Sequence, residues 1–340
     1  MSNHEPQSGN VPPSMQAMQL LWPGAIVVQA IHVAAELSVA DHLADGPKTV
    51  SELAAATKSD SVSLARLLRA LSSLGLFAED GPARFRQTPM SDTLRRDHPQ
   101  SIRRWAIMLG ARFVWEPCSE LRETIRTGRP AFELTYRAPF FRYLAEHPDD
   151  AAVFNAAMSS VPAYITAFVE AYDFSTFEHI VDVGGGHGAK LFAILAANAR
   201  VRGTLYDLPS VVEGAPAEHR SALDDRCQIV GGDFFEGVPR GADAYLLSGI
   251  IHDWTDEAAI RILRNCRRAI RPNGTLLLVE TVLTPSSDPS GALMDVLMMI
   301  LTGGRERTEA EFRALLQEAG FSLTRVIPTA GASILEATPQ

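Results

Sequence analysis

Residues 180–188 read Ile-Val-Asp-Val-Gly-Gly-Gly-His-Gly, and this stretch decides the fold of the chain. Its β-branched beginning predicts a buried parallel strand, because such strands are apolar on both faces. The glycines allow a sharp turn and a close approach to a ligand, since no Cβ obstructs the backbone. Residues 189–199 predict a helix whose N-terminus faces that turn. Strand, turn and helix together indicate the nucleotide-binding corner of an open α/β sheet.

Two nucleotide cofactors fit such a corner. Gly184, Gly186 and Ala189 loosely match the dinucleotide fingerprint, and Asp207 follows where an acid that binds the NAD ribose is expected. A glycine-rich turn alone can also be purely structural. The sequence therefore needs a second observation to separate the cofactors.

The next two predicted strands supply that observation. Residues 203–206 lead into Asp207, and residues 228–230 lead into Gly232-Asp233-Phe234. Acids at two successive strand ends can hold a ribose diol, and an aromatic ring can lie against a purine. This arrangement resembles the S-adenosylmethionine (SAM) site of class I methyltransferases more than an NAD site.

Composition sets the class of protein. A chain of 340 residues that is 46% hydrophobic predicts two domains, and a net charge of −9 argues against a general nucleic-acid binder. The three cysteines lack metal-ligand spacing, which predicts a reduced, cytoplasmic protein without a metal site. We expect no apolar run that approaches the roughly 20 residues of a membrane span. Residues 1–13 are expected to form a disordered tail.

The N-terminal third predicts helices. Residues 15–43 read as an apolar helix broken once at Pro23-Gly24, with little polar face. Such a helix must be covered, and a partner subunit is the expected cover, with burial inside its own domain as the alternative.

Helices and a hairpin follow this apolar segment. Thr49 and Glu52 form a capping-box pattern, leucines recur at helical spacing in residues 64–74, and Asp80-Gly81-Pro82 predicts a hairpin turn. Together they predict a winged-helix unit over residues 14–100. Residues 1–100 hold two Lys and six Arg against ten acidic residues, a net charge of −2, which favours a scaffold over a DNA-binding module.

The remaining chain divides in two. Residues 101–175 are helical and dense in aromatic side chains, which favours a core but also suits a cap over a substrate. From residue 176 strands and helices alternate, which predicts a parallel sheet, with a reversed strand at the end.

Candidate chemistry lies at strand ends. His252 follows a strand predicted over residues 242–247, and a histidine there can take a proton at neutral pH. Glu280 ends the next strand, and Glu306 precedes a later helix. Two carboxylates beside one imidazole would fix its tautomer and stabilise the imidazolium. The alternatives are a structural histidine, and a Glu306 that is solvated or paired with Arg305.

Five motifs occur in the order found in one family. The chain resembles the SAM-dependent O-methyltransferases that include plant caffeic acid and acetylserotonin enzymes and bacterial antibiotic-tailoring enzymes. The resemblance covers nearly the whole chain. The motifs are residues 181–188, Asp207-Leu208-Pro209, Gly232-Asp233-Phe234-Phe235, Ile251-His252-Asp253-Trp254 and residues 303–308, Gly-Gly-Arg-Glu-Arg-Thr.

This resemblance implies a class I, Rossmann-like methyltransferase domain that binds SAM over residues 176–340, preceded by a helical linker and substrate cap and by a winged-helix dimerisation domain. It implies His252 as the general base, flanked by Glu280 and Glu306. The cofactor contacts are expected from Asp182, Gly184, Gly186, Asp207, Leu208, Asp233, Phe234 and Ser248. The substrate pocket is expected from Trp115, Phe154, Asn155, Met158, Trp254, Leu297 and Met298.

One position departs from the family pattern. Relatives often carry lysine or arginine four residues before the histidine, where this chain has Ser248. We expect a homodimeric, cytoplasmic enzyme of secondary metabolism that methylates a hydroxyl of an aromatic small molecule. We expect it to bind neither a membrane nor nucleic acid. The alternatives are a SAM-binding relative that hydroxylates or decarboxylates a polyketide-like substrate, and a SAM-responsive DNA-binding regulator.

Overall fold

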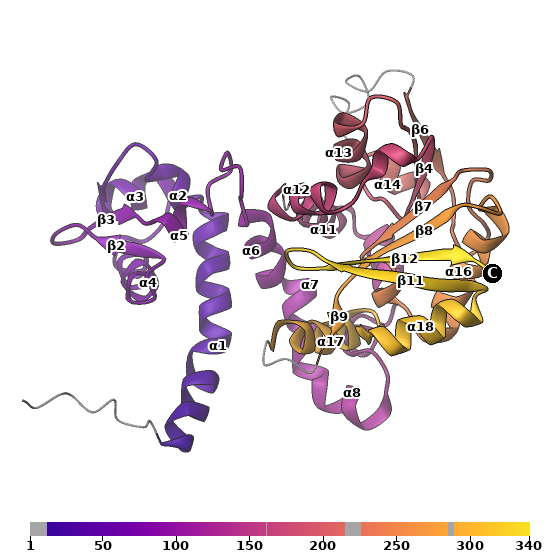
Figure 1. Ribbon diagram of the computed structural model, residues 1–340. Helices are drawn as coiled ribbons and strands as arrows, with labels where there is room; N and C mark the ends of the chain where they lie inside the picture. The colour runs from indigo at the N-terminus through magenta and orange to yellow at the C-terminus, as the bar shows by residue number, and fades with distance from the viewer. Residues whose placement is uncertain (1–11, 161, 215–225, 285–288) are drawn as a thin grey trace, which may run out of the picture. The chain divides into compact units, whose positions relative to one another are not determined.

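The computed structural model describes residues 12–160, 162–214, 226–284 and 289–340, and the chain forms two compact units, 1–111 and 112–340 (Figure 1). Most of the predicted N-terminal tail lies outside the described residues. The first unit extends beyond the predicted boundary at residue 100 because α6 (Arg103–Gly110) packs on α1 (Pro13–Glu36). The Gln29 amide donates to the Gly110 carbonyl at 3.0 Å and ties the two helices together.

Helix α1 corrects the sequence prediction, because it continues through Pro23 instead of breaking there. A proline removes one backbone hydrogen bond, and the turns on either side continue the helix. The helix ends at Glu36, just before Ser38 adopts a left-handed φ of 53°. The unbroken helix, with a mean hydropathy of 1.4, is long and apolar enough by length and composition to cross a membrane, against the prediction that no such run exists.

The rest of the first unit is the predicted winged helix. Helices α2 (Val39–His42), α3 (Val50–Thr57), α4 (Ser61–Ser73) and α5 (Pro89–Asp92) accompany an antiparallel sheet in the order β1-β3-β2. Its strands are β1 (Lys48–Thr49), β2 (Phe77–Glu79) and β3 (Arg84–Gln87). The predicted capping box is present, since Thr49 and Glu52 exchange hydrogen bonds at the start of α3.

The second unit is built on a seven-stranded sheet in the order β11-β12-β8-β7-β4-β5-β6 (Figure 1). All neighbours are parallel except β12, which runs antiparallel to β11 and β8. The predicted reversed final strand is therefore confirmed. The strands are β4 (His179–Val183), β5 (Arg202–Asp207), β6 (Cys227–Gly231), β7 (Ala244–Ser248), β8 (Thr275–Glu280), β11 (Phe321–Pro328) and β12 (Ser333–Pro339).

Helices bury both faces of this sheet. On one face α16 (Asp256–Ala269) and α18 (Glu309–Glu318) pack against Val181 and Val183 of β4. On the other, α12 (Pro162–Ala171) and α13 (Ala189–Ala197) contribute to a core that includes Ile180. The alternation along β4 explains why this strand is apolar on both faces.

The cap and the connections complete the second unit. They comprise α7 (Arg112–Trp115), η1 (Glu116–Glu120), α8 (Leu121–Thr127), α9 (Ala131–Tyr136), α10 (Phe140–Glu146), α11 (Pro148–Met158), η2 (Phe174–Thr176), α14 (Pro209–Val212), η4 (Ile251–Asp253) and α17 (Pro289–Leu301). Strand β9 (Val282–Leu283) pairs in parallel with β10 (Arg307–Thr308). This short pairing brings the segment around Glu306 next to the end of β8.

Candidate active site

The predicted site residues gather at the carboxyl ends of five adjacent strands. Gly184, Asp207 and Asp233 follow or end β4, β5 and β6, while Ser248 and Glu280 end β7 and β8. The strand order reverses between β4 and β7, because the chain proceeds outward from β4 on one side and from β7 on the other. Open α/β sheets bind ligands at such a reversal.

The glycine turn after β4 has the geometry that only glycine accepts readily. Gly184 and Gly186 have φ values of 70° and 58°. A Cβ on Gly184 would lie 2.5 Å from Ile250 Cδ1, whereas a Cβ on Gly186 would have no atom within 4 Å. The turn is therefore packed below Gly184 and has open space at Gly186, where a ligand can approach the backbone.

Asp207 connects the turn to β5. Its Oδ2 accepts a hydrogen bond from the Gly186 amide at 2.8 Å, and its Oδ1 accepts one from the Leu208 amide at 2.7 Å. Burial raises the pKa of Asp207, against the effect of these amides. Each carboxylate oxygen keeps a second lone pair, so the side chain can also accept from a ribose diol.

Asp182 lies beneath the turn and is only 2% exposed. A Cβ on Gly185 would lie 2.6 Å from its Oδ2, so the carboxylate packs against the turn. Burial raises the pKa of Asp182 to about 7, although the charge of Lys190 acts in the opposite direction.

The loop after β6 presents Phe234 toward the glycine turn. A Cβ on Gly184 would lie 3.5 Å from Phe234 Cε1. The Asn265 side chain donates to the carbonyls of Phe234 and Phe235 at 2.6 and 3.0 Å and holds this loop. Asp233 is exposed, and its Oδ1 accepts from the Phe235 amide at 2.8 Å. Leu208, the residue after Asp207, is 39% exposed and offers an apolar surface near the predicted cofactor acids Asp207 and Asp233.

His252 lies in η4, directly after β7, and Glu306 is its hydrogen-bond partner. The Nδ1 atom is 2.8 Å from Glu306 Oε1, and the Glu306 side chain is fully buried. The carboxylate therefore accepts from Nδ1–H, which leaves Nε2 to accept a proton. Nε2 faces Gly249, where a Cβ would lie 3.6 Å away. The alternative of a solvated Glu306 is wrong, since the residue is 1% exposed.

Glu280 holds the turn rather than the ring. Its Oε1 accepts from the amides of Ile250 and Ile251 at 3.1 and 2.8 Å, and its Oε2 lies 3.9 Å from His252 Nδ1. Both Glu280 Oε2 and Glu306 Oε2 are buried and have no hydrogen-bond partner among the described residues. The structure thus brings the three predicted residues together with two different contacts.

Asp253 adds a carboxylate that the sequence analysis did not single out. Its Oδ1 is 3.9 Å from His252 Nε2. Burial lowers the pKa of His252, but the charges of Asp253, Glu280 and Glu306 outweigh it and raise this pKa to about 10. Burial in turn raises the pKa of Asp253 to about 7. The cluster therefore favours a proton on the imidazole.

The same cluster has donor atoms of the kind that bind a metal ion. One atom each from His252, Glu280 and Glu306 lies within 4.8 Å of the others. However, Nδ1 of His252 is engaged with Glu306, and Oε1 of Glu280 accepts from two amides. These hydrogen bonds favour a proton-transfer site over a metal centre.

Aromatic rings lead from this cluster into the cap. Phe141 stacks on Trp254 with ring centres 5.6 Å apart, and it meets Phe154 edge-on at 6.3 Å. Phe141 thereby joins two predicted substrate residues, a link that sequence spacing does not reveal. Met298 is buried in α17, and Met158 is 41% exposed at the end of α11. Trp115 ends α7, Asn155 lies in α11 and Leu297 in α17, and the described contacts do not join these three to the aromatic group.

Comparisons with known proteins identify the family to which the chain belongs. Residues 118–322 match the O-methyltransferase domain, and residues 20–97 match the O-methyltransferase dimerisation domain. The chain is 43% identical over 337 residues to a phenazine O-methyltransferase of Lysobacter antibioticus, with 98% of each chain covered. It is also 36% identical over 307 residues to the aclacinomycin 10-hydroxylase of Streptomyces purpurascens, covering 88% of this chain and 82% of the relative.

Solved structures are similar over nearly the whole chain. That of the protein LaPhzM has a TM-score of 0.91 at 42% identity, with 96% of this chain and 100% of that chain covered. An O-methyltransferase of neocarzinostatin biosynthesis, in complex with SAM and 2-hydroxy-5-methyl naphthoic acid, has a TM-score of 0.79 at 37% identity, with 92% and 96% covered. The predicted class I methyltransferase fold is therefore confirmed.

Proposed function

This chain belongs to the SAM-dependent O-methyltransferase family of secondary metabolism, and we propose that it methylates an aromatic hydroxyl with His252 as the general base. The observation that carries the proposal is the 2.8 Å contact between His252 Nδ1 and the buried Glu306. It orients the ring so that Nε2 of the neutral imidazole can take the proton of a substrate hydroxyl.

The base is needed because a phenol, with a pKa of about 10, is mostly protonated at neutral pH. SAM, when bound, supplies a methyl group on a sulfonium leaving group. The protein then has to align the substrate oxygen and remove its proton. Glu306 orients the imidazole. Glu280 accepts hydrogen bonds from the Ile250 and Ile251 amides and so fixes the turn that carries the imidazole.

The proposed SAM site lies over the glycine turn. Asp207 would accept from the ribose, and Phe234 would lie against the adenine. Gly184 and Gly186 admit the cofactor, Asp182 supports the turn from below, and Leu208, Asp233 and Ser248 line the edge. Ser248 offers a hydroxyl where relatives often carry a basic side chain.

The aromatic group favours a flat, apolar substrate. Trp254 and Phe154 are its proposed walls, linked by Phe141. We assign the same pocket to Trp115, Asn155, Met158, Leu297 and Met298. The naphthoic acid in the structure of the neocarzinostatin relative supports this class of ligand. We also propose a cytoplasmic homodimer, which the dimerisation domain supports.

A labelled-SAM assay tests the function. Wild-type protein is incubated with methyl-labelled SAM and a panel of hydroxylated phenazines, benzoates and naphthoates, and label in the aromatic product is measured. We expect transfer to at least one phenolic hydroxyl. The similarity to a 10-hydroxylase supplies a second candidate. SAM binding with hydroxylated or decarboxylated product, but no labelled ether, would favour that candidate.

A further inference from the structure

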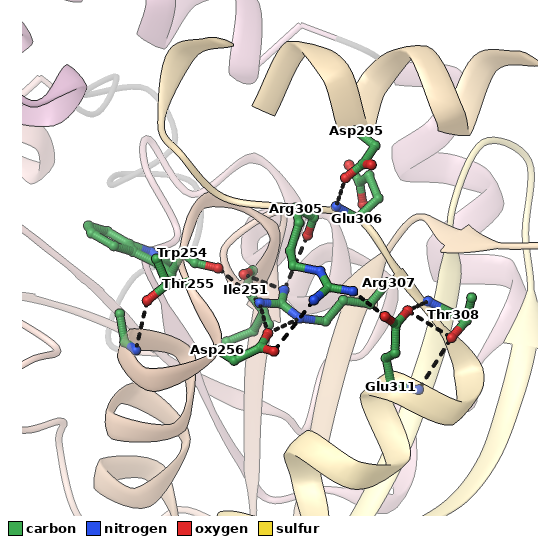
Figure 2. A network of polar contacts seen from close by, with 11 residues as sticks. Ile251, Trp254, Thr255, Asp256, Asp295, Arg305, Glu306, Arg307, Thr308 and Glu311 are labelled. Atoms are coloured by element: carbon green, nitrogen blue, oxygen red, sulfur yellow. Dashed lines mark hydrogen bonds and ion pairs between the residues drawn. The ribbon is translucent and has the colours of Figure 1, made fainter. Parts of the chain in front are cut away.

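Arg307 is a buried cation next to the proposed base, and its donors are fully used. The residue is 1% exposed and lies in β10, immediately after Glu306. Nε and Nη2 donate to Asp256 Oδ1 at 2.9 and 2.7 Å (Figure 2). A guanidinium has five N–H donors, and the contacts to Asp256 use two of them.

The other three donors hold backbone carbonyls. Nη1 donates to the carbonyls of Ile251 and Arg305 at 3.0 and 3.2 Å, and Nη2 donates to that of Trp254 at 2.9 Å. Ile251 and Trp254 flank His252 and Asp253 in the chain. Figure 2 shows the two carbonyls to which Arg307 donates. The planar, rigid fork of arginine therefore spans the turn that carries the imidazole.

The neighbouring residues bind the same turn from the same segment. The Arg305 amide donates to the His252 carbonyl at 2.8 Å. Gly304 lies so close that a Cβ would be 2.0 Å from that carbonyl oxygen. Glu306 orients the ring, and its own amide donates to Asp295 Oδ1 at 2.8 Å. Residues 304–307 thus fix both the backbone and the ring of His252.

We propose that Arg307, paired with Asp256, is a positioning residue for methyl transfer. It holds the turn that carries His252 in place relative to Glu306. This inference rests on the proposed role of His252 as the base. A side chain that only fixes the turn should matter for turnover and little for SAM affinity. A displacement of about 1 Å can cost about 10²-fold in rate, so the effect should be measurable.

The test compares single and double variants in methyl-transfer kinetics and in SAM calorimetry. We expect Arg307→Gln to lower kcat about 10- to 100-fold with SAM affinity changed less than about threefold. Arg307→Lys should restore little of the lost kcat, because one ammonium group cannot reach the carbonyls of both Ile251 and Trp254. In a His252→Ala background Arg307→Gln should cost less than about twofold more, since residues that act through one group are not additive.

Two further variants keep the result interpretable. Asp256→Asn leaves the guanidinium in place and removes the charge of its partly exposed partner, so it tests the Arg307–Asp256 pair if Arg307→Gln does not fold. It should lower kcat about three- to tenfold, again without further loss in the His252→Ala background. Arg313→Gln is the matched control, because Arg313 also donates to a backbone carbonyl, that of Leu323, and pairs with Glu309.

The outcomes separate the two proposals. A His252→Ala variant with the wild-type rate would overturn the proposed role of His252 as the base. It would also overturn the proposed role of Arg307, which depends on that of His252. A slow His252→Ala beside an Arg307→Gln of wild-type rate keeps the base and overturns the role of Arg307. Losses that multiply in the double variant overturn it as well, because they show an effect independent of His252.

Discussion

His252 is partly buried and lies beside three carboxylates, and burial and these charges have opposite effects on its pKa. Burial lowers its pKa, while the charges of Asp253, Glu280 and Glu306 stabilise the imidazolium and raise the pKa to about 10. A base with this pKa accepts a proton strongly, but only its neutral fraction can do so. The free enzyme should therefore gain activity as the pH rises above neutrality.

We predict that kcat/KM for a simple phenol rises with pH from 7 towards 10. Glu306→Gln should move this rise to lower pH, because a lost carboxylate destabilises the imidazolium and lowers the pKa of His252. Its plateau should also be lower, since the ring loses its charged partner. Stopped-time assays across pH 6–10 measure both, with His252→Ala reporting ionisation of the substrate alone. A profile that Glu306→Gln leaves unmoved would contradict the assignment.

Loss of the imidazole gives a second prediction. His252→Ala should cut turnover about 10²–10⁴-fold, the range for a lost general base, and leave SAM affinity nearly unchanged. Glu280→Gln should cut it less, because glutamine keeps an oxygen for the Ile250 and Ile251 amides. Substrates with more acidic hydroxyls should depend on His252 less. An equal loss for every phenol would indicate positioning without proton transfer.

Asp207 provides a third prediction at the cofactor. Asp207→Ala removes the acceptor of the Gly186 amide as well as the proposed ribose contact. Calorimetry should show SAM binding weakened by about 1–3 kcal/mol, as expected for a lost charge-assisted hydrogen bond. Asp173→Ala is the matched control, because Asp173 also accepts from a backbone amide, that of Ser175, but is not part of the proposed site. Unchanged SAM affinity in Asp207→Ala would place the cofactor elsewhere.

At the scale of elements, the sequence predicts regular segments well and the contacts between them poorly. Strand β4 and helix α13 follow from a β-branched run and a glycine turn, and the reversal of β12 was expected. The continuation of α1 through Pro23 was missed, because one lost hydrogen bond does not outweigh the flanking turns. The contacts of Arg307 and Phe141 were not predicted, because β9–β10 pairing and ring stacking join residues far apart in the chain. Asp253 was adjacent to His252 in the motif, a signal that was available.

The approach of residues 304–307 to η4 gives a prediction at this scale. Gly304→Ala would place a methyl group 2.0 Å from the His252 carbonyl oxygen, so the loop must move. We expect destabilisation by about 1–3 kcal/mol together with lower kcat, measured by urea unfolding and by methyl transfer. Gly237→Ala is the control, since its Cβ would have no atom within 4 Å. A fully stable and active Gly304→Ala would show that the loop does not fix the turn.

At the scale of the whole molecule, the first unit leaves a large apolar surface on α1. Leu20 and Leu21 are 81% and 73% exposed, and Ile26 is 59% exposed. Exposed apolar side chains gathered on one helix are typical of an interaction site, and residues 20–97 match a dimerisation domain. We therefore propose that a second copy of the chain covers this surface of α1.

The last prediction follows from that cover. Light scattering at micromolar concentration should report about twice the chain mass of 36.9 kDa. Leu20→Asp with Leu21→Asp should shift the protein to monomer, because charges buried at an apolar interface are costly without a partner. Val62→Asp is the matched control, since Val62 is 68% exposed in the same unit but lies on α4. If the double variant keeps the mass of the wild type, α1 does not hold the two copies together. If wild type is already a monomer, the dimer itself is refuted, and the apolar face of α1 requires another partner.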